Sequence, residues 1–167
     1  MSKIIILNLS DKTTKELKQY LNKIDNNVKI LEDNFTLIKS GGTNMKIKLL
    51  DINYIDSVER RLAYHLINKE VEYSNTMKTN FANEVQHLTD NHTFMVIAGQ
   101  NLLVNMLNIK SVDKRDCAIH FENGDSVRIP KARLNDIYNL WKKKLYLINF
   151  IGEYLFTRLF NWSNPYK

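Results

Sequence analysis

Residues 94–109 have the sequence FMVIAGQNLLVNMLNI, in which two short apolar runs flank three residues that favour a turn. The first run, Phe94–Ala98, and the second, Leu102–Val104, each have a length that suits a strand. The GQN sequence at 99–101 between them predicts a tight connection. Asn105 then interrupts the second run, and we expect its side chain to bond the backbone around a bend in the strand. The stretch therefore predicts an apolar strand that is halted at 99–101 and resumes at Leu102.

On the N-terminal side, apolar residues recur at alternate positions from Met45 to Ser74, a pattern typical of half-buried strands. Three or four successive strands with short polar connections are predicted from the apolar positions Ile47, Leu49, Ile52, Tyr54, Leu62, Tyr64, Leu66, Val71 and Tyr73. Asn75-Thr76 is expected to cap a helix that runs to Leu88. Thr89–His92 is expected to form the turn that follows this helix.

The C-terminal side contains the best short hairpin signal in the sequence. Cys117–Glu122 and Asp125–Ile129 flank Asn123-Gly124, a dipeptide favoured in two-residue hairpin turns. Pro130 ends these strands, and a helix is expected from Lys131 onward. Its apolar positions recur at helical spacing and are Leu134, Ile137, Tyr138, Trp141, Leu145 and Ile148.

The two ends of the chain differ from this central part. Residues 1–44 predict a strand at Lys3–Leu9, an amphipathic helix and two brief strands, and the SGGTN turn cluster at 40–44 marks the expected boundary. Leu145–Phe160 is apolar on several faces, yet it is shorter than the roughly 20 residues that a membrane span needs. Its own core, a second subunit or a membrane partner could cover it. We therefore predict an N-terminal strand-helix extension, a central domain at 45–144 and an apolar helical extension at 145–167.

Charge and composition exclude several classes of function. The chain has 167 residues, a formal net charge of +6 and a pI of about 9.3. Residues 45–144 carry 15 Lys and Arg against 12 Asp and Glu, so any nucleic-acid site must depend on a few placed cations. Cys117 is the single cysteine, which excludes an intrachain disulfide framework, and the four histidines share no metal-ligand spacing. No catalytic motif is recognisable, and the short apolar start is too brief for a secretory signal. We expect a cytoplasmic protein that is not an enzyme and needs no metal or cofactor.

Three segments carry a resemblance to a known family. They are INYIDS at 52–57, MVIAGQNLLVNMLNI at 95–109, and the stretch from FENGD at 121–125 through Arg133. In this order and spacing they resemble the LytTR family of bacterial DNA-binding domains, over roughly Met45–Lys144. The resemblance implies an α+β, mainly β fold with a β-strand core.

The resemblance also implies a transcription regulator that inserts loops into successive major grooves of repeated promoter sequences in double-stranded DNA. Carried over residue by residue, the DNA-binding positions are Arg60 and Arg61 in the first loop, Gln100 and Asn101 in the second, and Lys131 and Arg133 at the start of the helix. The sequence departs from the family pattern at Ile97, Gly99, Asn101 and Lys131-Ala132, which makes the central loop less basic than usual.

The residues themselves support part of this interpretation. Lys131 and Arg133 lie at an expected helix start, where cations oppose the helix dipole and where a phosphate would be favoured. An Arg can bond guanine and a Gln can bond adenine in the major groove. Alternatives remain open at each position: an ion pair of Arg133 with Asp136, a simple turn at 100–101, and a solvated turn at 60–61 with Glu59 as a local partner. Lys110, Lys114 and Arg115 are expected to be solvated hairpin residues or phosphate contacts.

Regulation and partners follow from the same resemblance. The 44 residues before the domain are too few for a phosphoacceptor receiver, so control is expected to come from oligomerisation, expression level or a partner. A homodimer formed through either end of the chain is expected, and some compact family members are paired with a membrane-bound inhibitor protein. The alternative is a protein-interaction module on the same fold, in which the neutral loop at 99–101 reflects weakened or lost DNA binding.

Overall fold

The N-terminal part of the chain forms a compact unit of its own. The computed structural model describes residues 3–6, 28–31 and 35–143, and the chain divides into two units, Met1–Asp51 and Ile52–Lys167. In the first unit β1 (Lys3–Ile6) pairs in parallel with β2 (Val28–Leu31), which confirms strands at both places. The helix predicted between them lies outside the described residues.

A hairpin completes the first unit. β3 (Phe35–Ser40) and β4 (Thr43–Lys48) are antiparallel, and a short 3-10 helix at Leu49–Asp51 follows. Gly41 and Gly42 form the turn with φ of 55° and 85°, values that glycine adopts without the steric cost of a side chain. The turn predicted at 40–44 is thus confirmed as the hairpin turn, and the division of the chain at 44 stays a prediction.

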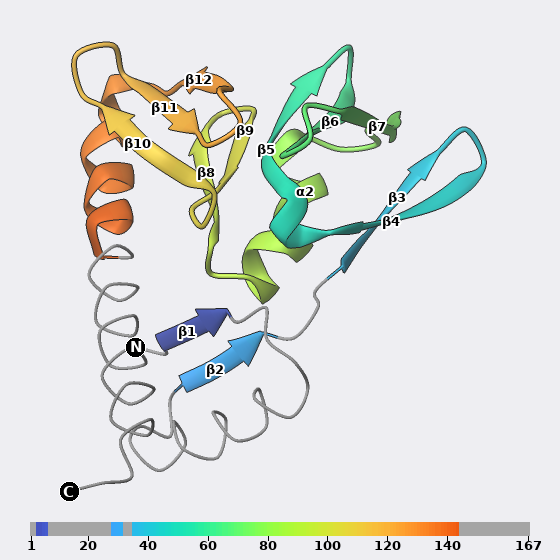
Figure 1. Cartoon of the computed structure of the whole chain (residues 1–167). Coiled ribbons are helices and arrows are strands. Elements are labelled where there is room, and N and C mark those ends of the chain that lie inside the picture. Colours follow the sequence, from blue (N-terminus) through green and yellow to red (C-terminus); the bar gives the residue numbers. More distant parts are fainter. Residues whose placement is uncertain (1–2, 7–27, 32–34, 144–167) are drawn as a thin grey trace, which may run out of the picture. The chain divides into compact units, whose positions relative to one another are not determined.

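The second unit contains a five-stranded antiparallel sheet with the order β7-β6-β5-β9-β8 (Figure 1). Its strands confirm the alternating pattern of the sequence and the two runs around 99–101; they are β5 (Ile52–Val58), β6 (Arg61–Leu66), β7 (Val71–Thr76), β8 (Met95–Gly99) and β9 (Leu102–Asn105). The central strands β5 and β9 pair through Tyr54 and Val104. Because these two strands are distant in sequence, their pairing fixes where the turn after β5 and the turn before β9 lie.

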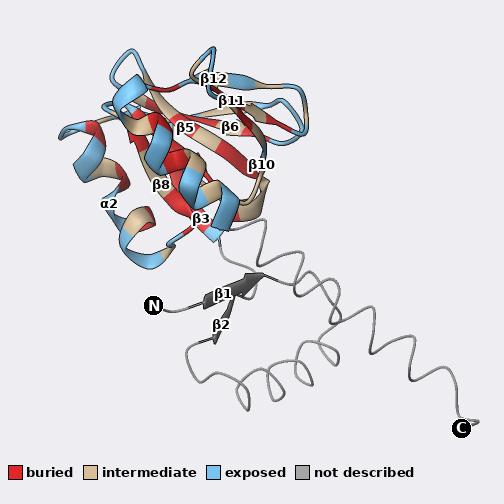
Figure 2. Cartoon of the chain, turned by 90° about the vertical axis from the view of Figure 1, so that its left-hand side faces the viewer, coloured by how far each residue is buried: buried red, intermediate tan, exposed pale blue. Residues whose placement is uncertain are grey.

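The second unit also contains a three-stranded sheet and a helix that pack against one another. The strands are β10 (Ile109–Asp113), β11 (Ala118–Phe121) and β12 (Ser126–Arg128), and the last two confirm the hairpin predicted around Asn123-Gly124. A helix over residues 131–143, as predicted from Lys131, buries Leu134 and Ile137 in the core formed with these strands. Figure 2 shows its opposite face exposed. The continuation of this helix past 143 lies outside the described residues.

One expectation about α2 (Phe81–Asn91) is wrong. Asn75 and Thr76 belong to the end of β7, where Thr76 pairs with Arg61, and the helix is capped by Asn80, whose side-chain oxygen accepts the N–H of Asn83 at 2.9 Å. The helix also runs to Asn91, through most of the turn expected at 89–92. The sequence predicts an apolar face of Met77, Phe81, Val85 and Leu88; the last three are buried in the helix, and Met77 lies before its start. The start differs because the sheet takes up the first candidate caps, and Asn80 replaces them.

The segment before α2 is held by a carboxylate of the helix itself. Oε1 of Glu84 accepts the backbone N–H groups of Lys78 and Thr79 at 2.9 and 2.8 Å, and the hydroxyl of Thr79 at 2.9 Å. These bonds hold the pKa of Glu84 below its usual value, and the bond from the Thr79 backbone contributes most.

The described helices include none that is long and apolar enough to span a bilayer.

Candidate nucleic-acid interface

The β5–β6 hairpin presents Arg60 at its tip. Val58 and Arg61 are the last paired residues, so the turn consists of Glu59 and Arg60 alone. Both have positive φ, 50° and 61°, as in the two-residue turns that normally contain Asn-Gly. Residues with a Cβ are disfavoured in this conformation. The side chain of Arg60 is exposed, and its carbonyl accepts the N–H of Met77 at 2.7 Å, which ties the turn to the residue after β7.

The sheet register brings a second turn to the same end. β5 and β9 are antiparallel with Asp56 opposite Leu102, so continuing the same register would place Val58 opposite Gln100. Gln100 and Asn101 form the connection between β8 and β9, and both are exposed. Adjacent strands lie about 4.8 Å apart. The turns at 59–60 and 100–101 therefore lie next to one another beyond the ends of β5 and β9.

Two contacts add the start of helix 131–143 to this arrangement. A Cβ built on Gly99 would lie 3.4 Å from Cδ of Pro130, so the backbone entering the β8–β9 turn lies directly against that ring. Nη2 of Arg133 donates to the carbonyl of Ile97 in β8 at 2.9 Å. We call the three segments, residues 59–60, 100–101 and 130–133, the loop end.

Arg133 is held by two partners. Besides the Ile97 carbonyl, its guanidinium bonds Oδ2 of Asp136 through Nη1 at 3.2 Å. These two bonds use only part of the five N–H donors of an Arg, and the side chain is 43% exposed. The alternative of an Asp136 ion pair is thus confirmed as the arrangement of the free protein, and it leaves donors of Arg133 available at the surface.

Arg61 has a different environment from Arg60. Its Nε donates to the carbonyl of Ser74 at 2.7 Å, and its guanidinium lies 5.6 Å from the ring centroid of Tyr73. The side chain therefore lies along β7 and braces the hairpin that carries Arg60. Lys131 is exposed at the helix start, and among the described residues no acidic side chain pairs with Arg60, Arg61 or Lys131.

All six residues selected from the sequence are thus on or beside the loop end. Arg60, Gln100, Asn101 and Lys131 are exposed there, whereas Arg61 and Arg133 are partly engaged with the backbone of neighbouring strands. The sequence did not predict the bond between Arg133 and Ile97, because 36 residues separate them and nothing in either segment indicates the pairing. The contact between Gly99 and Pro130 was missed for the same reason.

Asn105 has the structural role expected of it. It is fully buried, its amide donates to the carbonyl of Ile52 at 2.9 Å, and its Oδ1 accepts the N–H of Leu107 at 3.0 Å. The residue closes the bend after β9 and is not available to a ligand. In the described part of the chain, His, Cys, Asp and Glu side chains nowhere gather in threes that could hold a metal ion.

The described part of the second unit is thus a mainly β domain with exposed cations and amides on three adjacent loops. Residues 42–142 match the family model of the LytTr DNA-binding domain, and the chain belongs to this family. The family is one of DNA-binding domains, so DNA is the partner that membership indicates.

Comparison with other proteins adds one solved structure. A LytTr DNA-binding domain from Bacillus cereus is similar to this chain, with 12% sequence identity and a TM-score of 0.48, over 70% of this chain and 98% of that one. No curated protein matches the sequence.

Proposed function

We propose that the protein is a sequence-specific transcription regulator whose loop end contacts double-stranded DNA. The observation that carries the proposal is the placement of three loops, distant in sequence, at one end of the five-stranded sheet. In this proposal the three loops enter successive major grooves of repeated promoter sequences.

The residues divide into two roles. Arg133 and Gln100 have the side chains that bond guanine and adenine, and each such pair discriminates against a wrong base by about 1–3 kcal/mol. Arg60, Lys131 and Asn101 hold phosphates and fix the register of the protein on the duplex. Lys131 is suited to this because the helix start adds its own partial positive charge toward a phosphate.

A mobility shift on the protein's own promoter tests the assignment of Arg133. The Arg133→Ala variant should lose most of its preference for the promoter over a scrambled duplex of equal length, at matched salt. The matched control is Arg128→Ala, an exposed cation of β12 outside the loop end, which should keep the preference. If Arg133→Ala binds the promoter as tightly as the wild type, the base contact assigned to Arg133 is wrong.

The second candidate is a protein-interaction module on the same fold. Two observations favour it: the turn at 100–101 has no charge, and Arg133 already bonds Ile97 and Asp136 in the free protein. Such a module would bind mixed duplex DNA weakly and with little dependence on salt, whereas a DNA-binding domain loses affinity steeply as salt rises.

The proposed protein partners are a second copy of the chain and a membrane-bound inhibitor, and the proposed location is the cytoplasm. The homodimer draws its support from the apolar sequence of residues 145–160, which lies outside the described residues, and from the repeated promoter sequences expected as targets. Light scattering on the full chain at tens of micromolar should report a dimer. A monomer under those conditions contradicts this part of the proposal.

A further inference from the structure

We propose that Lys114 and Lys142, which both lie against the ring of Tyr138, form a second phosphate-binding site for duplex DNA, continuous with Lys131. This inference rests on the proposed function, because it extends the DNA contact from the loop end along helix 131–143. We call Lys114, Tyr138 and Lys142 the Tyr138 cluster.

The cluster places two ammonium groups against one aromatic ring. Nζ of Lys114 is 3.8 Å from the ring centroid of Tyr138, and Nζ of Lys142 is 4.9 Å from the same centroid. In the described part of the chain, neither lysine has an acidic partner within ion-pair distance. Because both ammonium groups lie no more than 4.9 Å from one ring centroid, their separation is comparable to or shorter than the screening length of about 8 Å at physiological salt, and they repel one another. A phosphate beside both would replace this repulsion with attraction.

Helical spacing connects the cluster to the loop end. Lys131, Asn135, Tyr138 and Lys142 follow one another at intervals of four, three and four residues, so they share one face of helix 131–143. The first, second and last of these are exposed, and Tyr138 is half-buried. The stripe therefore begins at a loop-end residue and contains no acidic side chain.

The spacing also suits a DNA groove. Tyr138 lies five residues beyond Arg133, about 7.5 Å along the helix axis, and the major groove is about 12 Å wide. Tyr138 also lies about 140° around the helix from Arg133, so the Tyr138 cluster would meet phosphates that border the groove and not the bases assigned to Arg133. Phosphate contacts of this kind position a protein on DNA and carry no sequence information.

The turn that carries Lys114 is fixed in place. Oδ1 of Asp113 accepts the N–H groups of Arg115 at 2.7 Å and Asp116 at 3.2 Å, which closes the connection between β10 and β11. These bonds keep the pKa of Asp113 below its usual value, and the bond from the Asp116 backbone contributes most. Lys114 is thus presented from an ordered turn, in which the Asp113 carboxylate accepts backbone N–H groups and Asp116 is exposed.

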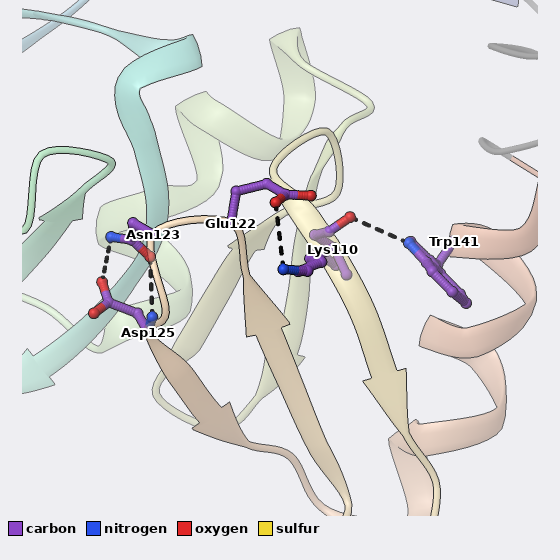
Figure 3. A network of polar contacts seen from close by, with 6 residues as sticks. Lys110, Glu122, Asn123, Asp125 and Trp141 are labelled. Atoms are coloured by element: carbon purple, nitrogen blue, oxygen red, sulfur yellow. Dashed lines mark hydrogen bonds and ion pairs between the residues drawn. The ribbon is translucent and has the colours of Figure 1, made fainter.

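Lys110, on the neighbouring strand β10, provides the matched control. Its Nζ lies 3.7 Å from Oε2 of Glu122, and Figure 3 shows this pair beside Trp141, whose Nε1 donates to the Ile109 carbonyl at 3.3 Å. Lys110 is exposed on the strand that leads to the Lys114 turn, but its charge is paired with that of Glu122. Removing it should change DNA binding far less than removing Lys114.

The experiment measures binding of the full chain to its own promoter and to a scrambled duplex over a range of salt. The double variant K114Q/K142Q should bind both duplexes several-fold more weakly, by the same factor. The slope of log K against log salt should shrink by about 0.9 for each phosphate that the variant no longer neutralises. Lys110→Gln should leave both quantities near those of the wild type.

The outcomes separate this inference from the proposed function. If K114Q/K142Q behaves like Lys110→Gln while Arg133→Ala loses the promoter preference, the cluster is a solvated surface and the inference is wrong, but the proposed function stands. If only promoter binding falls, the lysines contact bases and the phosphate site is wrong. If the wild type shows no salt-dependent binding to either duplex, the proposed function fails and the inference fails with it.

Discussion

Asn105 illustrates how one buried amide determines where a strand ends. Its side chain joins two backbone groups, the carbonyl of Ile52 and the N–H of Leu107, across the bend after β9. Asn108 donates to the same Ile52 carbonyl at 3.0 Å. A buried polar group without a partner costs about 1–3 kcal/mol, so the bend depends on these bonds.

Replacing Asn105 with Ala should lower the free energy of unfolding by about 2 kcal/mol, because the Leu107 N–H loses this acceptor inside the protein. Asn108→Ala is the control, since it removes one donor to Ile52 and leaves Asn105 in place. Urea unfolding followed by circular dichroism measures both. An Asn105→Ala variant as stable as Asn108→Ala would show that the bend does not depend on Asn105.

Residue chemistry also limits what the sequence alone could predict. The backbone role of Asn105 was predictable, because an Asn in an apolar run has few other uses. The bond of Arg133 to Ile97 was not, because it arises only when β8 and the start of helix 131–143 meet in the folded chain. The ion pair of Arg133 with Asp136 could be foreseen, since residues three apart are neighbours on a helix.

At the scale of elements, strands were easier to predict than helix ends. β5, β6 and β7 follow an alternating apolar pattern that depends on which face is buried, and this pattern is visible in the sequence. The start of α2 was misplaced because Asn75, Thr76 and Asn80 are all good caps, and only the pairing of β7 with β6 decides between them. Boundaries that depend on pairing between distant segments cannot be recovered from local propensity.

The β5–β6 turn offers a test in which stability and DNA binding move in opposite directions. Replacing Glu59-Arg60 with Asn-Gly should stabilise the protein by about 1–2 kcal/mol, because these residues adopt positive φ at lower cost. The same change should weaken DNA binding, because the cation at the tip is removed.

Glu59→Asn alone is the control for the turn. It should give part of the stabilisation and keep DNA affinity at or above that of the wild type, since Arg60 remains and an acid is removed. Thermal unfolding and fluorescence anisotropy measure the two quantities. If the Asn-Gly variant binds DNA like the wild type, Arg60 is not a DNA contact.

His92, at the end of α2, should make stability depend on pH. Its pKa is lowered by burial and, to a smaller extent, by the nearby His87, and its buried Nδ1 has no hydrogen-bond partner among the described residues. A lowered folded-state pKa means that the unfolded chain binds the proton more readily. Stability is therefore fully present above the unfolded value of about 6.5 and is lost as pH falls through the folded value.

The His92→Phe variant should remove this dependence. Relative to the wild type, it should become progressively more stable between pH 7.5 and pH 5.5, because its ring takes up no proton and leaves no polar atom unsatisfied. Urea unfolding at the two pH values gives the comparison. A difference between variant and wild type that is the same at both pH values would contradict the role given to His92.

At the scale of the whole molecule, charge placement matters more than net charge. The formal +6 is spread along the chain, and the central domain carries a small excess of cations. The fold nevertheless gathers Arg60, Lys131 and Arg133 at the loop end with Arg61 beside them, and it brings Lys114 and Lys142 to the ring of Tyr138 on the adjoining helix. The proposed DNA contact therefore depends on a few placed cations and not on bulk charge.

The salt dependence of binding to mixed duplex DNA tests this account most directly. If the loop end and the Tyr138 cluster contact phosphates, log K should fall linearly with log salt, with a slope of roughly −3 or steeper at about 0.9 per phosphate neutralised. Fluorescence anisotropy of the full chain between 50 and 200 mM salt, about the range over which such slopes are resolved, gives the value. Binding that is absent or independent of salt across this range would contradict the account and favour the protein-interaction module.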